Sequence, residues 1–322
     1  MISINGYRIE VGHFPDRTQM LMDIPMGGIL SKAVSDSDIM KFTWRYESDE
    51  ELVTLMYLRR HIEEKAKYVS NRKFRYNLMM PYIPNARMDR VEVISECFTL
   101  KYFSEMINMM RFDSVTVFDP HSTVSCALIN NIFLLNPISE ISNALRCMKL
   151  ENVDLKSEDI VLYFPDEGAY KRYSKLFNPG SGHELLIEYM NNMFIYGSKK
   201  RDWSTGKING LTIRDRDGNI LQDNALQGRT VLMIDDIISY GGTLAYSVDK
   251  VKEQGAGDIY AYASHTENSV MDDEKGTLLK RFLEGKFKRL YTTDSIYTLP
   301  YDGNNPENIE KYKMIAYAYK WW

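Results

Sequence analysis

The segment from Val231 to Thr243 carries residue types suited to binding a phosphorylated sugar. Four apolar residues, Val231 to Ile234, precede two adjacent carboxylates, Asp235 and Asp236, and a Gly-Gly-Thr turn follows. An apolar run of this length before a helical pattern favours a buried parallel strand, and open α/β sheets bind ligands at the carboxyl ends of such strands. Backbone N–H groups at the start of the following helix favour a phosphate. The pattern predicts a ribose-phosphate site, the alternative being an ordinary strand–turn–helix whose acids cap the helix.

Two polar clusters in the first half of the chain also follow short apolar runs. Arg87 and Arg90 lie on a loop stiffened by prolines, and an arginine can stack on a purine or pair with phosphate oxygens. Asp119 and His121 follow the run 115–118 and suit a Mg²⁺-bound triphosphate, because carboxylate oxygen is a hard ligand and imidazole can contact phosphate. Surface arginines on a turn and a core or capping histidine are the structural alternatives.

Two more clusters lie in the second half. Asp166 stands in a turn that leads into a helical pattern, where it suits either a sugar hydroxyl or a helix N-cap. Lys199 and Arg201 lie in a basic stretch between Gly197 and Gly206. That stretch predicts a loop that closes over a phosphoryl group and neutralises its charge, with a solvated basic loop as the alternative.

The elements that must position these clusters alternate between apolar runs and helical patterns. We expect short N-terminal strands at 7–11 and 19–24, later strands near 78–80, 115–118, 160–164, 193–196, 231–234 and 259–264, and helices over 50–70, 98–110, 167–177 and 244–254. Such alternation predicts βαβ units with a mainly parallel sheet, formed twice along the chain. The sequence therefore predicts an α/β protein with an N-terminal domain at 1–145, a C-terminal domain at 146–322 and a polar hairpin-type loop at 214–228.

The composition narrows the class of protein. The 322 residues are 44% hydrophobic and 26% charged, with a formal net charge of −4, as is usual for a soluble globular protein. This balance argues against a general nucleic-acid binder. The three widely spaced cysteines form neither a metal knuckle nor a disulfide framework, and no stretch reaches the length of a membrane span. We expect a cytoplasmic protein with no nucleic-acid and no membrane partner.

The order of the clusters resembles that of the ribose-phosphate pyrophosphokinases, or phosphoribosyl pyrophosphate (PRPP) synthetases. The matching motifs are Pro-Tyr-x-x-x-Ala-Arg-x-Asp-Arg at 81–90, Asp-x-His at 119–121, Pro-Asp-x-Gly at 165–168, Lys-x-Arg at 199–201 and the Asp-Asp loop at 235–243. The resemblance spans almost the full chain. It implies two phosphoribosyltransferase-like (Rossmann-like) α/β domains with mainly parallel sheets, in a dimer-based homo-oligomer that is often a hexamer. It also implies a Mg²⁺-dependent enzyme that transfers the diphosphoryl group of ATP to the C1 hydroxyl of ribose 5-phosphate and releases AMP.

The same resemblance implies a role for each cluster, with ATP on the N-terminal domain and the ribose phosphate on the C-terminal one. The residues that would bind ATP are Phe14 (from a neighbouring subunit), Asp16, Arg87, Asp89, Arg90 and His121. Those that would serve the metal are Asp119, His121 and Asp166. Those that would act in catalysis are Lys199, Arg201 and His121. Those that would bind the ribose phosphate are Asp166, Asp235, Asp236, Ser239, Tyr240, Gly241, Gly242 and Thr243.

Three departures from the family pattern bear on function. Met88 replaces a glutamine, and residues 91–97 contain none of the basic side chains that serve the family's allosteric anion site, which argues against phosphate activation and ADP inhibition. Ser239-Tyr240 replaces Asp-Thr in the loop that would hold the 5-phosphate. An aromatic ring there suits an acceptor that continues beyond the phosphate. We therefore expect either ribose 5-phosphate, with PRPP as product, or a 5-extended ribose such as ADP-ribose, whose pyrophosphate would feed NAD salvage.

Two other functions stay open. A PRPP-dependent phosphoribosyltransferase would use the same loop, but it needs neither two domains nor the clusters at Arg87 and at Asp119 and His121. A non-catalytic regulatory subunit would keep the fold and lose catalytic groups, whereas Lys199 and Arg201 are retained.

Overall fold

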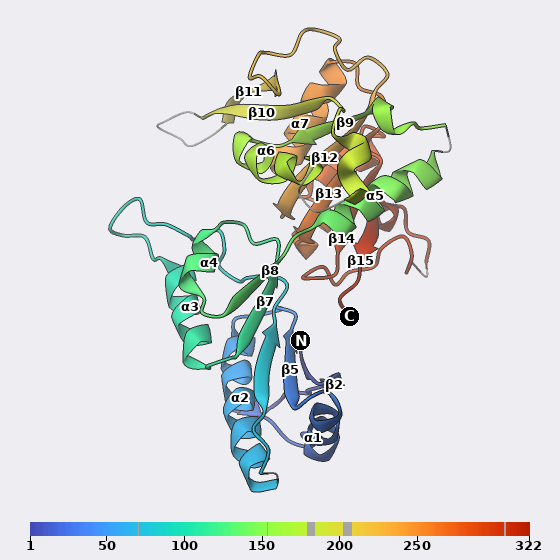
Figure 1. Cartoon of the computed structure of the whole chain (residues 1–322). Coiled ribbons are helices and arrows are strands. Elements are labelled where there is room, and N and C mark those ends of the chain that lie inside the picture. Colours follow the sequence, from blue (N-terminus) through green and yellow to red (C-terminus); the bar gives the residue numbers. More distant parts are fainter. Residues whose placement is uncertain (70, 153, 179–183, 202–207, 306) are drawn as a thin grey trace. The chain divides into compact units, whose positions relative to one another are not determined.

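The computed structural model describes residues 1–69, 71–152, 154–178, 184–201, 208–305 and 307–322, without the side chains of 69, 184–185, 199–201 and 208–209. These residues form two compact units, Met1–Asn136 (unit 1) and Pro137–Trp322 (unit 2), coloured blue to green and green to red in Figure 1. The division precedes the expected point after residue 145 because helix α5 (Ile138–Glu151) packs on the sheet of unit 2. Within the described ranges, no helix has the length and hydropathy that a bilayer span requires.

Unit 1 is built on a six-stranded sheet in the order β2-β1-β5-β6-β7-β8. Its strands are β1 (Ile2–Ile4), β2 (Tyr7–Arg8), β5 (Ile39–Trp44), β6 (Arg75–Met79), β7 (Ser114–Phe118) and β8 (Ile132–Leu135). Its helices are α1 (Met26–Ser35), α2 (Glu50–Val69), α3 (Thr99–Met109) and α4 (Val124–Leu128), and a separate hairpin comprises β3 (Gly12–His13) and β4 (Gln19–Met20). In this sheet strands β5 to β8 pair in parallel, and β1 pairs in the antiparallel sense with β2 and β5.

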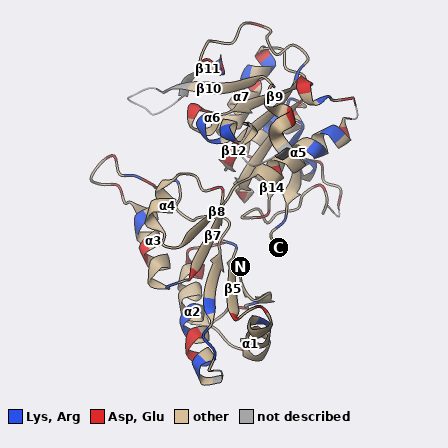
Figure 2. Ribbon diagram, viewed as in Figure 1, with Lys and Arg blue, Asp and Glu red and all other residues tan. Residues whose placement is uncertain are grey.

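The hydrophobic pattern explains why α2 covers this sheet. Leu55, Leu58 and Ile62 recur at helical spacing and are fully buried, whereas Figure 2 shows acidic and basic residues along the rest of α2. In β5, Met40 and Phe42 alternate with exposed or half-buried residues and point into the same core. The predicted helix at 50–70 is thereby confirmed.

Unit 2 is built on a seven-stranded sheet in the order β11-β10-β9-β12-β13-β14-β15. Its strands are β9 (Ile160–Phe164), β10 (Phe194–Arg201), β11 (Ile208–Asp215), β12 (Thr230–Ile238), β13 (Ile259–Thr266), β14 (Arg289–Thr293) and β15 (Ile315–Tyr319). Its helices are α5, α6 (Glu167–Tyr173), α7 (Gly242–Glu253) and α8 (Thr277–Leu283), with 3₁₀ turns at Ser157–Asp159, Ser174–Phe177, Glu184–Tyr189, Asn268–Met271 and Glu310–Met314. Among the described residues of this sheet, neighbouring strands pair in parallel except β10 with β11. The predicted α/β class with mainly parallel sheets is confirmed.

The central strand β12 separates two hydrophobic cores. Val231 and Met233 pack with residues of α7, while Leu232 and Ile234 pack with residues of α5 and α6. This alternation follows from the two-residue period of a strand, and it fixes the face to which each later residue of β12 points.

Two segments differ from the sequence-based expectation. β12 does not stop at Ile234 but continues through both aspartates to Ile238, because β13 supplies pairing partners along that length. The basic stretch expected as a loop begins as strand, since Lys199 to Arg201 pair through their backbones with β11. The polar segment 214–228 does begin with a tight turn, in which the Asp215 carboxylate accepts from the N–H groups of Asp217 and Asn219.

Candidate functional site

Three carboxyl groups surround the carboxyl end of β9. Asp166 comes two residues after this strand ends, and Asp235 and Asp236 lie in the neighbouring strand β12. Since Met233 pairs with Tyr163 in parallel register, Asp235 is level with residue 165, just past the end of β9. Beyond this level β12 still pairs with β13 on one side, through Ile238. On its other side β9 has ended, so β12 has no paired β9 residue there. A ligand at the end of β9 therefore has carboxyl groups from both β12 and the start of α6 around it.

Asp166 is held in place by the helix that it opens. Its Oδ1 accepts a hydrogen bond of 2.9 Å from the backbone N–H of Ala169, which makes it the N-cap of α6. The capping role considered from the sequence is thus present, and it fixes the carboxyl group at the end of β9.

The two adjacent acids of β12 have different surroundings. The Asp236 carboxylate is 8% exposed and its Oδ1 lies 3.6 Å from Nη1 of Arg172, in the last turn of α6. The backbone N–H of Asp236 donates to Oδ1 of Asp235 at 3.0 Å. Burial raises the pKa of Asp235 well above its ordinary value, and the charges of Asp236 and Asp166 raise that pKa further. One acid therefore pairs with a cation, and the other faces two acidic neighbours.

The loop from Ser239 to Gly241 connects β12 to α7. Gly241 has φ +81°, and a Cβ at this position would lie 2.5 Å from Cβ of Leu278, so the turn requires glycine. Gly241 is also the N-cap residue of α7, whose first residues are Gly242 and Thr243. The first N–H groups of a helix have no partner within the helix and attract anions. The predicted glycine turn before a helix is confirmed.

The start of α8 binds the loop between β12 and α7 by hydrogen bonds. The backbone N–H and the hydroxyl of Thr277 both donate to the carbonyl oxygen of Tyr240, each at 2.9 Å. Tyr240 is 41% exposed, and Nζ of Lys275 lies 6.0 Å from the centroid of its ring. A cation and an aromatic ring therefore stand together beside the start of α7.

Gly197 lets β10 approach the same end of the sheet closely. A Cβ at this position would lie 2.7 Å from both the Pro165 carbonyl oxygen and the Tyr163 hydroxyl. Lys199 and Arg201 follow in β10, and their side chains lie outside the described residues. The strand that bears them is thus adjacent to β9, the strand that leads to Asp166.

In unit 1 the expected ATP-side residues follow adjacent strands. The backbone N–H of Phe118, the last residue of β7, donates to the Pro81 carbonyl oxygen at 3.0 Å. This bond ties the loop that bears Arg87 to the strand end that precedes Asp119. Asp119 has φ +38° and is 5% exposed, and His121 two residues later is partly exposed. The two predicted clusters of this unit therefore start from neighbouring points of one sheet edge.

The remaining residues expected near ATP are exposed or half-buried. Phe14 and Asp16 lie in the turn between β3 and β4, where Phe14 is 50% exposed. The N–H and hydroxyl of Thr18 donate to Asp16 and lower its pKa. Arg90 forms an exposed ion pair of 3.0 Å with Glu92. Asp89 is half-buried.

Metal ligands do not form a preassembled cluster within the described ranges, which contain no group of three or more His, Cys, Asp and Glu residues placed to hold an ion. Mg²⁺ is commonly bound by one or two carboxylates together with water and substrate phosphates. Asp119 and Asp166 have the hard oxygen atoms that such binding needs, and they belong to different units.

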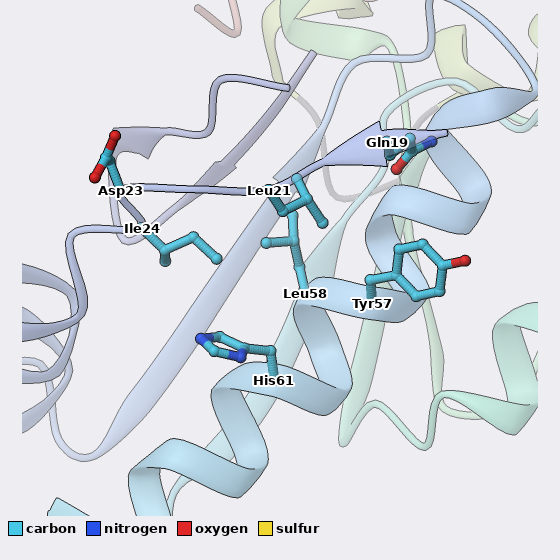
Figure 3. Close-up of a pocket in the computed structure, with 7 residues that line it drawn as sticks. All are labelled: Gln19, Leu21, Asp23, Ile24, Tyr57, Leu58 and His61. Carbon is cyan, nitrogen blue, oxygen red and sulfur yellow. The ribbon is translucent and has the colours of Figure 1, made fainter. Parts of the chain in front are cut away.

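A separate cavity of about 500 Å³ lies beside α2 in unit 1. Figure 3 shows Leu21, Ile24 and Leu58 at its centre and His61 at its edge, and Gln19, Asp23 and Tyr57 complete the lining. None of the residues expected to bind ATP lines it.

The chain is similar to known proteins in sequence and in fold. The chain is 28% identical over 222 residues to ribose-phosphate pyrophosphokinase 2 of Enterococcus faecalis, a match that covers 69% of this chain and 59% of the relative. It is 27% identical over 246 residues to ribose-phosphate pyrophosphokinase 1 of Streptococcus pneumoniae, with 76% and 65% covered. The structure aligns with the phosphoribosylpyrophosphate synthetase of Mycobacterium smegmatis at a TM-score of 0.61 and 16% identity, covering 97% of this chain and 86% of that one.

The chain is a divergent relative of the ribose-phosphate pyrophosphokinases. It spans less than two thirds of the length of these two curated relatives, and no family model matches it. Its fold is that of a phosphoribosylpyrophosphate synthetase.

Three residues beside the expected ribose-phosphate site were not found from the sequence. Arg172 had no signal of its own, because a basic residue in the last turn of a helix is favourable in any protein. Lys275 and Thr277 lie more than thirty residues after the loop that they contact, and no local pattern reports such a distance. These three residues add two cations and a hydrogen-bond donor to the motif-based description of the site.

Proposed function

We propose that this protein is a Mg²⁺-dependent pyrophosphokinase that transfers the diphosphoryl group of ATP to the C1 hydroxyl of a ribose 5-phosphate-type acceptor and releases AMP. The observation that carries the proposal is the group of three carboxyl groups at the end of β9, beside a glycine loop that opens α7. Similarity to ribose-phosphate pyrophosphokinases supports the same reaction.

The acceptor binds in unit 2 in this proposal. Asp235 and Asp236 accept hydrogen bonds from the ribose hydroxyls, and the first N–H groups of α7 donate to the 5-phosphate. Because the two aspartates leave β12 toward opposite faces, one diol can contact both only at the open end of β9. Asp166, fixed as the N-cap of α6, is the third carboxyl group at that position.

Unit 1 binds ATP in this proposal. Arg87 and the exposed Phe14 stack on the adenine, Phe14 coming from a second subunit of a dimer-based homo-oligomer. Asp119 and His121 serve the phosphates, and Asp16, Asp89 and Arg90 lie around the nucleotide.

Diphosphoryl transfer needs in-line positioning and neutralisation of charge more than covalent help. The C1 hydroxyl oxygen forms a bond to the β-phosphorus of ATP, and its proton passes to solvent. The bond from that phosphorus to the oxygen that bridges it to the α-phosphorus breaks, and AMP leaves with this oxygen. Lys199 and Arg201 neutralise the diphosphoryl group as it moves. In unit 1 Asp119 and His121, and in unit 2 Asp166, would each hold Mg²⁺ together with phosphate oxygens, and the metal would supply further positive charge.

The acceptor is either ribose 5-phosphate or a 5-extended ribose such as ADP-ribose, and the surroundings of Tyr240 favour the longer one. A 41%-exposed aromatic ring with Lys275 6.0 Å from its centroid offers both a stacking surface and a cation beyond the 5-phosphate. Ribose 5-phosphate alone would leave both unused. The product would then be ADP-ribose pyrophosphate, a precursor for NAD salvage.

The experiment is to measure AMP release from ATP and Mg²⁺ by the purified chain, with ribose 5-phosphate and with ADP-ribose in parallel. Formation of AMP that depends on an acceptor supports the pyrophosphokinase, and a higher kcat/KM for ADP-ribose supports the extended acceptor. Strong turnover of ribose 5-phosphate alone excludes the extended acceptor. A chain that makes no AMP but consumes PRPP with a nucleobase is a phosphoribosyltransferase, and one inactive in both assays fits a regulatory subunit.

A further inference from the structure

We propose that Arg172 is a positioning residue for acceptor binding, acting through Asp236; this rests on the proposed function of the three carboxyl groups. Arg172 lies in the last turn of α6, the same helix whose N-cap residue is Asp166. One short helix therefore holds a carboxyl group at its start and an arginine near its end, both beside the end of β9.

The two side chains of this ion pair differ in exposure, with the acid more buried than the arginine. The Asp236 carboxylate is 8% exposed, whereas the Arg172 side chain is 33% exposed. Nη1 of Arg172 lies 3.6 Å from Oδ1 of Asp236, so the arginine forms an ion pair with the acid on the face of the sheet where α6 lies. A guanidinium is a planar group with fixed donor directions, and it restricts the plane of a carboxylate more than an ammonium does.

Asp235 is coupled to Asp236 in two ways. The backbone N–H of Asp236 donates to Oδ1 of Asp235 at 3.0 Å, and the two carboxyl groups are close enough for their charges to interact. Without the cation, the nearly buried Asp236 carboxylate would lose a charge partner and would repel Asp235 more strongly. Acceptor affinity, which depends on both aspartates, should therefore fall, while ATP binding should be unaffected.

The test compares wild type with Arg172→Ala, Arg172→Lys and Asp236→Asn, and with Arg172→Ala combined with Asp236→Asn. The matched control is Lys171→Ala, which removes a neighbouring cation of α6 whose ion pair of 2.6 Å with Glu167 is exposed. Steady-state AMP release gives KM for the acceptor and for ATP separately, calorimetry gives the Kd of ribose 5-phosphate and of ADP-ribose, and thermal unfolding reports stability.

The expected result is a rise of about tenfold or more in acceptor KM and Kd for Arg172→Ala, with partial recovery in Arg172→Lys and a change below twofold in KM for ATP. The double variant should be no weaker in acceptor binding than the worse single variant. Lys171→Ala should match wild type in every measurement.

The proposal is overturned if Arg172→Ala unfolds at a lower temperature yet keeps wild-type acceptor KM and Kd, since a purely structural ion pair predicts that pattern. If wild type binds the acceptor but releases no AMP, the proposed function fails while Kd still tests Arg172. If wild type binds neither acceptor, both fail.

Discussion

Thr277 holds Tyr240 by two hydrogen bonds to one carbonyl oxygen, from its N–H and its hydroxyl, each 2.9 Å long. The loop at the start of α7 is therefore shaped by the start of α8. Thr277→Val keeps the N–H donor and the shape of the side chain but removes the hydroxyl. A hydrogen bond of this kind contributes about 0.5–1.5 kcal/mol, so we expect acceptor KM to rise roughly twofold to tenfold. Thr298→Val, which removes a hydroxyl bonded to exposed Asn268, is the control. An unchanged acceptor KM would show that the loop keeps its shape without this bond.

Gly241→Ala should be more damaging than an ordinary glycine substitution. It combines φ +81° with a Cβ placed 2.5 Å from Cβ of Leu278. Left-handed backbone costs an alanine about 1–2 kcal/mol, and the overlap adds about 1–3 kcal/mol. Gly285→Ala measures the cost of the left-handed backbone alone, because Gly285 has φ +71° and an added Cβ there would have no atom within 4 Å. Urea unfolding should show a larger loss for Gly241→Ala; equal losses would mean that the neighbouring segment yields freely.

Substitutions of Asp166 separate its helix-capping role from its proposed role in the site. Asp166→Asn keeps an oxygen that can accept from the Ala169 N–H, so stability should stay near that of wild type while AMP release falls at least tenfold. Asp166→Ala should lose the activity and also about 1 kcal/mol of stability. Unfolding and AMP release are measured on the same samples. Full activity in Asp166→Asn would show that this residue acts only as the helix cap.

Asp235 should make stability decrease as the pH rises. Its native pKa is raised by burial and by the neighbouring Asp236 and Asp166, so the folded chain retains a proton that the unfolded chain loses near pH 4. Between the unfolded and the native pKa the folded state binds more protons, and the free energy of unfolding therefore falls with pH across that window. Asp235→Asn removes this loss, so its melting temperature should exceed that of wild type at pH 7 and approach it toward pH 4. A gap that is constant with pH would contradict the assignment. Acceptor binding should be lost in the variant.

Tyr240 and Lys275 should determine the length of the acceptor. Tyr240→Thr and Lys275→Ala should each lower kcat/KM for ADP-ribose about threefold to tenfold and leave ribose 5-phosphate nearly unchanged, because the ring and the cation lie beyond the 5-phosphate site. Lys286→Ala, which removes an exposed cation paired with Glu284, is the control. Equal effects on both acceptors would place Tyr240 in the 5-phosphate site instead.

The strand–loop–helix around Asp235 was predictable because an apolar run, a glycine turn and a helical period follow one another directly. The extension of β12 through Asp235 and Asp236 was not, since aspartate disfavours strands and only pairing with β13 compensates for it. The same holds for the basic stretch from Lys199 to Arg201, whose strand depends on a partner that follows in β11.

Helix α1 was missed for a local reason. It begins after Pro25 without a side-chain cap, and Gly27 and Gly28 lower its helix propensity. Gly28 lies where a Cβ would come 2.6 Å from the Tyr7 hydroxyl, so close packing against β2 accounts for the glycine there.

The separation of the two cores by β12 also bears on how this site can change. Asp235 points toward the side chains packed behind α7, and Asp236 toward those behind α6. A directed-evolution library confined to buried positions of α7 would therefore act first on Asp235, and a library on α6 would act first on Asp236. Because the two residues are joined by a hydrogen bond, either library would reach the acceptor site by substitutions that never touch the substrate.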